Sequence, residues 1–116
     1  MTKKHKQRKI IFYKNYFQDF FVKQRDKVKD KIIWTFDLIE ELQKVPVMYL
    51  KHIDNTKGLY EIRVQSGGDI FRIFCFFDKE QLVVIANDFQ KKSQKTPKYE
   101  IEKALKIKKE YENEKK

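Results

Sequence analysis

The fold is decided by residues 59–77, LYEIRVQSGGDIFRIFCFF, where two apolar-rich runs flank a pair of glycines. A two-residue loop at Gly67-Gly68 predicts a β-hairpin with a type I′ turn, because that turn needs positive φ at both central positions and glycine adopts it without steric cost. This loop fixes the register and places Arg63 opposite Arg72. Residues directly opposite each other share a face of the sheet, so we expect the two arginines to lie side by side.

The two faces of this hairpin differ in polarity. One face is wholly apolar or aromatic and is expected to lie against the core; its members are Tyr60, Ile62, Val64, Phe71, Ile73, Cys75 and Phe77. The other face carries Arg63 and Arg72 close to Glu61. Like charges directly opposite one another destabilise a sheet. Two interpretations follow: two solvated arginines with Glu61 as a local counter-ion, or an arginine pair that binds an anion.

Length and charge bound the class of protein. We expect one domain over residues 1–116, with residues 1–8 as a basic, mobile tail. The net charge of +10 favours a polyanionic partner such as RNA, DNA, the ribosome or an acidic membrane surface. The single cysteine excludes an intrachain disulfide and is typical of a reducing compartment. The chain has neither an apolar run of about 18 residues nor a signal-peptide core, so we expect a cytoplasmic protein without a membrane span.

Upstream of the hairpin, the pattern predicts one strand and two helices. Residues 9–13 are a short β-prone run. Asn15 opens a capping-box pattern, which predicts the start of the first helix. Residues 25–44 repeat apolar positions every three or four residues and predict a second helix, which Pro46 ends. The segment 47–57 is expected to be a connection.

Downstream of the hairpin, a tight turn after Asp78 leads to an apolar strand over residues 82–89, in which Asn87 would pair with Arg72. Phe89 would then pair with Ile70.

The pair Thr96-Pro97 predicts the start of a last helix, because threonine caps helices and proline is tolerated at the first helical position. This helix is expected to end near Asn113. The order of elements is then β-α-α-β-β-β-α. We expect an α+β fold: a mostly antiparallel sheet of about four strands, with the two N-terminal helices packed on it, a C-terminal helix, and the helices on one face.

Several cations outside the hairpin are expected near its arginines. Lys51 and His52 precede the strand that carries Arg63, and a basic cluster follows the last strand at Lys91, Lys92 and Lys95. These side chains could converge at one end of the sheet, although a lysine run is also typical of a solvated loop.

Other chemistries find little support in the sequence. Cys75 falls on the predicted core face, where a cysteine is a small buried hydrophobe rather than a nucleophile. Two histidines, with no CxxC and no clustered carboxylates, predict no metal site. The chain has no phosphate-binding P-loop and no GxGxxG motif, so we expect no cofactor.

An ordered set of motifs runs through the second half of the chain: LYEIR at 59–63, FRI at 71–73, LVV at 82–84, FQKKSQKTP at 89–97 and EIEKA at 100–104. This set resembles the RelE/HigB toxin superfamily, in particular its phage-derived, Gp49-like HigB branch. The resemblance covers residues 51–111. It implies a bacterial, cytoplasmic type II toxin with the compact RelE fold.

Toxins of this superfamily typically enter the A site of the 30S ribosomal subunit and cleave mRNA there, and in the HigB branch a HigA-like helix-turn-helix antitoxin neutralises them. The resemblance therefore implies mRNA, the ribosome and such an antitoxin as partners. It also implies that basic positions hold phosphate or take part in catalysis; here these are Lys51, Arg63, Arg72, Lys91 and Lys92.

The implied chemistry uses the RNA's own 2′-hydroxyl as the nucleophile on the adjacent phosphate and needs no metal. Guanidinium groups bind phosphate at two points and stay charged, which fits both arginines. A lysine could serve as acid or base where neighbouring cations lower its pKa. The acid–base candidates stay open and are Lys51, His52, Glu61, Lys91, Lys92 and Lys95. Three aromatic residues could stack on an exposed base, namely Phe74, Phe76 and Phe89.

Two other functions stay open. A ParE-type toxin on the same fold acts on DNA gyrase and cuts no RNA. A non-catalytic nucleic-acid-binding module would use the same basic face without producing RNA fragments.

Overall fold

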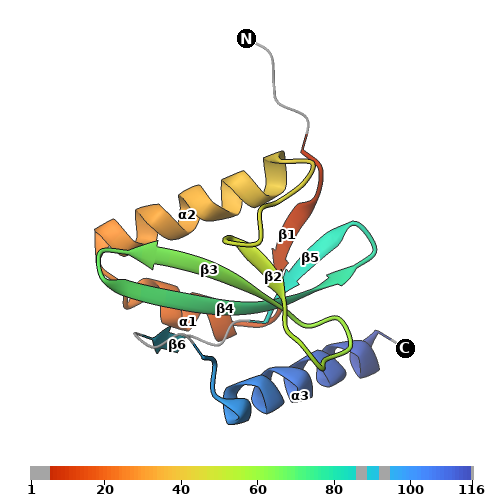
Figure 1. Ribbon diagram of the computed structural model, residues 1–116. Helices are drawn as coiled ribbons and strands as arrows, with labels where there is room; N and C mark the ends of the chain where they lie inside the picture. Colours follow the sequence, from red (N-terminus) through yellow and green to blue (C-terminus); the bar gives the residue numbers. More distant parts are fainter. Residues whose placement is uncertain (1–5, 86–88, 92–94, 116) are drawn as a thin grey trace.

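The described part of the chain forms an α+β fold with three helices and six strands (Figure 1). The computed structural model describes residues 6–85, 89–91 and 95–115, and of residues 89–91 it describes the backbone alone. The elements follow in the order β1 (Lys9–Phe12), α1 (Tyr16–Val22), α2 (Asp26–Glu41), β2 (Leu50–His52), β3 (Tyr60–Ser66), β4 (Asp69–Asp78), β5 (Gln81–Val84), β6 (Phe89–Lys91) and α3 (Lys98–Glu114). The predicted α+β class is confirmed.

The strands form one mixed sheet in the order β1-β5-β4-β3-β2, and β6 pairs with β4 beyond the end of β5. β1 runs parallel to β5, and the other pairs are antiparallel. The sheet is larger than the four strands predicted. β2 lies in the segment predicted as a connection, and two strands, β5 and β6, replace the single strand predicted over residues 82–89.

The β3–β4 hairpin has the predicted register, with Arg63 opposite Arg72. Its turn differs from the prediction, because Gly67 has a φ of 61° whereas Gly68 is not among the residues with positive φ. A left-handed residue at the first central position alone is typical of a type II′ turn rather than type I′. Both turns join the strands through two residues, so the register is the same.

The second hairpin follows the prediction only at its turn. Asp78 pairs with Gln81 as expected. Beyond β5 the register shifts by two residues, because Arg72 pairs with Phe89 and not with Asn87. Ile85 still donates its N–H to the carbonyl of Phe74 at 3.0 Å, so the expected register holds as far as Ile85.

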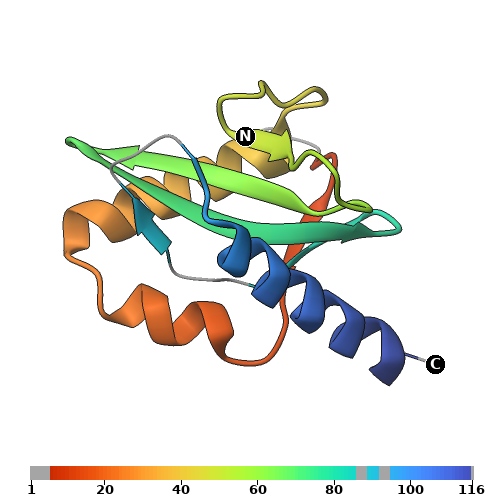
Figure 2. The ribbon, with the colours of Figure 1, turned by 60° about the horizontal axis from the view of Figure 1, so that its bottom comes forward.

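Helices cover both faces of the sheet, which corrects the expectation of one covered face. Figure 2 shows α3 on one side and the pair α1 and α2 on the other. On the α1–α2 side, the predicted core face of the hairpin is buried against the two helices. This cluster includes Phe20 and Ile32 from the helices and Ile62, Phe71, Ile73 and Cys75 from the hairpin. The α3 side buries a second cluster that includes Leu59, Phe74, Phe76, Ile85, Ala104 and Ile107. Phe77, predicted in the core, lies near the end of β4 and is exposed.

The end of α2 is tied to the residues before β1. The guanidinium of Arg8 donates to the carbonyls of Ile39, Leu42 at 2.8 Å and Gln43 at 2.9 Å. Lys6 also pairs with Glu40, and the N–H of Gln7 donates to the carbonyl of Glu40, so residues 6–8 all contact α2 or the residues that follow it; residues 1–5 of the expected tail lie outside the described part. Helix C-termini leave carbonyls without intrahelical partners, and a cation stabilises them.

The residues predicted to cap α1 and α3 lie just before these helices, but their side chains make no capping hydrogen bond. Asn15 precedes α1 and makes no side-chain cap hydrogen bond. Pro97 precedes α3 instead of occupying its first turn. The hydroxyl of Thr96, predicted as the cap, donates to Glu61 instead. Within the described residues, no helix has the length and the apolar character needed to cross a membrane.

Candidate active site

A cavity of about 390 Å³ opens where β2, β3 and β4 meet the chain segment that leads into α3. Six of the residues that the sequence singles out line it, namely Lys51, His52, Glu61, Arg63, Arg72 and Lys95. They come from four separate segments, so the predicted convergence of charged side chains is found in the fold. Thr96 and Ile101 complete the wall on the α3 side.

Strand pairing explains why these side chains meet. Lys51 on β2 lies opposite Glu61 on β3, and Arg63 on β3 lies opposite Arg72 on β4. Residues directly opposite share a face, and Glu61 and Arg63 share theirs because they are two positions apart on one strand. The face is the one that α3 covers further along, so the site lies beside the start of that helix.

Glu61 is the centre of the site. Its carboxylate accepts a hydrogen bond from the guanidinium of Arg72, lies 3.6 Å from Nε of Arg63, and accepts the hydroxyl of Thr96 at 3.2 Å. Its side chain is only 6% exposed. The carboxylate is therefore a counter-ion to both arginines, as the first interpretation expected, but Arg72 is buried and not solvated as that interpretation also required.

The two arginines are not equivalent, although the sequence treats them as a pair. The side chain of Arg63 is 30% exposed, whereas that of Arg72 is 3% exposed. Arg63 can therefore meet a ligand from solvent. Arg72 lies beside it on β4, is buried and donates a hydrogen bond to Glu61.

His52 lies at the exposed rim of the cavity. Its Nε2 is 3.1 Å from the carbonyl oxygen of Thr56, and its ring meets the ring of Tyr60 edge-on at 5.2 Å between centroids. A carbonyl oxygen only accepts, so this contact makes Nε2 the protonated nitrogen. Nδ1 of the neutral ring then carries the lone pair that a base needs.

Two predicted stacking residues are excluded by burial. Phe74 and Phe76 lie in the core beneath α3 and are almost fully buried, so they cannot stack on a base. The burial of these two rings was not predicted, because the sequence analysis expected helices on the opposite face only. The backbone of Phe89 pairs with that of Arg72, and Lys91 pairs with Ile70. Lys92 lies outside the described residues.

Thr96 is one of the lining residues that the sequence analysis did not identify, together with Ile53, Asp54 and Ile101. The pair Thr96-Pro97 read as a helix start, and that local signal hid a contact with a residue 35 positions earlier in the chain. Only the fold brings Glu61 and Thr96 together.

Metal and thiol chemistry find no support in the described residues. Among them, no group of three or more histidine, cysteine, aspartate or glutamate side chains could hold a metal ion. Burial raises the pKa of the Cys75 thiol, which is fully enclosed in the core.

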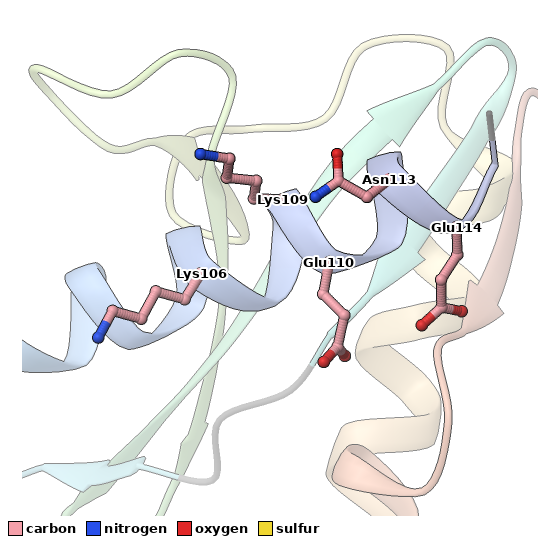
Figure 3. A pocket seen from close by; sticks show the side chains of 5 residues that line it. All are labelled: Lys106, Lys109, Glu110, Asn113 and Glu114. Carbon is pink, nitrogen blue, oxygen red and sulfur yellow. The ribbon is translucent and has the colours of Figure 1, made fainter.

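A second hollow, of about 430 Å³, lies along α3 and contains none of the predicted residues. Figure 3 shows its lining side chains spread along one helix, with lysines and carboxylates mixed: Lys106, Lys109, Glu110, Asn113 and Glu114. Glu110 and Glu114 already accept hydrogen bonds from Tyr13. Unlike the cavity at Glu61, this hollow is lined by side chains of a single helix and contains no arginine.

Comparison with protein families matches residues 19–109 to the family described as Phage derived protein Gp49-like (DUF891). The chain belongs to this family. The match includes all of α2, most of α1 and α3, and every described strand after β1. Family membership confirms the resemblance drawn from the motifs and makes this Gp49-like protein a RelE/HigB-like toxin.

Among solved structures, the Gp49-like chain is similar to the structure of the YoeB dimer from Staphylococcus aureus, with a TM-score of 0.51 and 18% sequence identity. The similarity covers 72% of this chain and 97% of the YoeB chain. At this identity the likeness shows a shared fold, which is RelE-like. A comparison with curated proteins found no match.

Proposed function

We propose that this Gp49-like toxin belongs to a type II toxin–antitoxin system and cleaves mRNA in the ribosomal A site, which arrests translation. The observation that carries the proposal is the convergence of Arg63, Lys51, His52 and Lys95 in one cavity around the buried Glu61. Lys51, Arg63 and Lys95 come from separate segments and meet in one hollow, and such a group of basic side chains suits a phosphate. The net charge of +10 adds a long-range attraction to RNA.

Each charged group has a role that follows from its exposure. Arg63 contacts the scissile phosphate and stabilises the charge that builds on its oxygens. Glu61 and Arg72 are positioning residues, because they are buried and hold Arg63 in place. Lys51 and Lys95 are exposed at the rim and bind the flanking backbone. The roles proposed for Lys91 and Lys92 rest on the resemblance alone.

The cleavage step balances within the RNA. The 2′-oxygen forms a bond to the adjacent phosphorus, and the bond from phosphorus to the 5′-oxygen breaks. A base takes the proton of the 2′-hydroxyl and an acid returns one to the leaving oxygen. We propose Nδ1 of His52 as the base, with Lys51 and Lys95 as candidate acids. The products are then a 2′,3′-cyclic phosphate and a 5′-hydroxyl.

The partner proposed for control of this activity is an antitoxin of the HigA-like, helix-turn-helix type. Because Arg63 must reach RNA, the antitoxin is expected to prevent access to the Glu61 cavity, directly or by holding the toxin away from the ribosome.

The test is induction of the toxin in bacteria, with incorporation of labelled methionine and labelled thymidine followed in parallel. We expect protein synthesis to stop first and the 5′ ends of cleaved mRNA to carry hydroxyl groups, which accept phosphate directly from a polynucleotide kinase. A DNA-damage response with intact mRNA would instead support action on gyrase. RNA binding without arrest or fragments would support a non-catalytic module.

A further inference from the structure

A smaller hollow, of about 180 Å³, shares Arg63 with the candidate active site. Its other lining residues come from α2, from the segment before β2, and from the β3–β4 hairpin. They include Lys31, Met48, Tyr49, Gln65 and Ile70.

The fold fixes this hollow next to Arg63. Gln65 is two residues beyond Arg63 on β3, so both side chains point to the same face, and Ile70 lies directly opposite Gln65 on β4. The N–H of Arg63 donates to the carbonyl of Tyr49 at 3.0 Å. Strand β3 and this backbone hydrogen bond therefore hold Gln65 and Tyr49 next to Arg63, the residue that the two hollows share.

The aromatic side chain that lines the hollow, Tyr49, packs against Trp34 on α2. The ring of Tyr49 meets that of Trp34 on α2 at an interplanar angle of 70°, with 5.8 Å between centroids. The ammonium of Lys31 lies over the Trp34 ring, 4.5 Å from its centroid. Edge-to-face and cation–π contacts of this kind fix ring orientation.

We propose that this hollow is a specificity subsite that binds one nucleobase of the RNA, next to the phosphate that Arg63 holds. The inference rests on the proposed function and extends it to base preference. Every phosphate in RNA has a base on each side, so a hollow that shares the phosphate-binding arginine lies within reach of one of them.

The lining suits a base better than a sugar or a second phosphate. Tyr49, Met48 and Ile70 offer apolar contact to the flat faces of a ring system. Gln65 is exposed, and its amide offers both a donor and an acceptor to the polar edge of a base. Stacking then supplies affinity for any base, and Gln65 supplies the preference among them.

The test measures kcat/KM on mRNAs that differ in one nucleotide at each position around the cut. Gln65→Leu keeps the size of the side chain and removes its amide. We expect wild type to favour one base at one position, and Gln65→Leu to lower that preference by about 10-fold, as expected for loss of a two-point contact to a base edge. Gln81→Leu, the same change on β5, is the control and should keep the wild-type preference.

A second variant separates affinity from preference. Tyr49→Leu removes the stacking ring and should raise KM for all four bases while the preference at that position persists. Circular dichroism and a melting curve check that both variants are folded.

The two proposals fail in different ways. An active Gln65→Leu variant with the full wild-type preference, or a wild type without preference at any position, overturns the base subsite and leaves the ribonuclease intact. A wild type that cuts no mRNA overturns the ribonuclease, and the subsite with it.

Discussion

At the scale of single residues, the site is organised by one buried carboxylate. Glu61 meets Arg72, Arg63 and the hydroxyl of Thr96 at once, and so joins β3, β4 and the start of α3. A buried carboxylate is costly unless it is paired and hydrogen-bonded, and here it has both kinds of partner. Its negative charge allows two arginines to face each other on neighbouring strands, and only Arg63 faces solvent.

Removal of Arg72 should therefore damage the fold as well as the site. We expect Arg72→Ala to lower the free energy of unfolding by about 3 kcal/mol, at the lower end of the cost of leaving a buried charge without its main partner, because Arg63 still faces Glu61. Urea unfolding measured by circular dichroism gives this value.

The matched control replaces both charges with apolar side chains of similar size, Glu61→Leu with Arg72→Met. This double variant should be more stable than Arg72→Ala, because no buried charge is left unpaired. Equal or greater loss of stability in the double variant would contradict the central place given to this pair.

At the scale of elements, α2 depends on the residue that precedes the first strand. The guanidinium of Arg8 donates to three carbonyls at the end of the helix. We expect Arg8→Ala to cost about 1–2 kcal/mol of unfolding free energy, because those carbonyls lose a charged donor. Hydrogen exchange should show faster opening in the last turn of α2. Arg8→Ala with wild-type stability and exchange would show that the contact contributes nothing.

Two carboxylates join the far half of α3 to its neighbours, Glu110 on the helix itself and Asp78 on β4. Glu110 accepts hydrogen bonds from Lys14 and Tyr13, and Asp78 at the end of β4 accepts one from Tyr111. The hydrogen bond from Lys14, followed by that from Tyr13, lowers the pKa of Glu110 below its ordinary value of 4.5. The hydrogen bond from Tyr111, followed by that from Lys115, lowers the pKa of Asp78 below 3.8.

These shifts make α3 sensitive to acid. A carboxyl whose pKa is lowered by folding stabilises the fold above its ordinary pKa and loses that contribution as pH falls through the folded value. We expect Glu110→Gln to be less stable than wild type at pH 7, with a gap that narrows as the pH falls below 4.5. Urea unfolding across this pH range measures the gap, and Glu102→Gln controls for the loss of one negative charge on α3. A gap that does not change with pH would contradict the assignment.

The sequence predicts best those elements whose signals are local. Gly67-Gly68 fixes the β3–β4 register even though the turn type differs, and apolar periodicity locates α1 and α2. β2 was missed because three residues are too few to show alternation. The packing of α3 on the second face was not predicted. β4 has apolar residues on both faces, and this pattern alone does not show whether a helix or solvent covers the second one.

For the site, the sequence predicts which residues take part but not how they are layered. Arg72 is buried where β6 pairs with β4, whereas Arg63 on β3 is partly exposed, and the hairpin sequence alone does not indicate the position of β6. Thr96 was hidden for a similar reason, because its role needs a contact between distant segments.

At the scale of the whole molecule, function follows from where the helices leave the sheet uncovered. α1 and α2 close one face, and α3 crosses the other obliquely (Figure 2). The charged cavity opens beside the first turn of α3, where the edge strand β2 brings Lys51 and His52 to Glu61. A rigid scaffold with its polar groups gathered at one opening suits a substrate that brings its own nucleophile and needs only to be oriented and neutralised.

The central claim is that Arg63, held by Glu61, acts on the phosphate of ribosome-bound mRNA. The most direct measurement is single-turnover cleavage of a defined mRNA on ribosomes with an empty A site, with 5′ ends mapped by primer extension. Purified wild type is compared with Arg63→Ala and with Arg25→Ala, an exposed arginine outside the cavity that loses the same charge. We expect wild type and Arg25→Ala to cut at the same positions and Arg63→Ala to be slower by about 100-fold or more, the usual cost of removing a group that stabilises the transition-state charge. Intact mRNA with wild type, or cleavage by Arg63→Ala at the wild-type rate, would contradict the account.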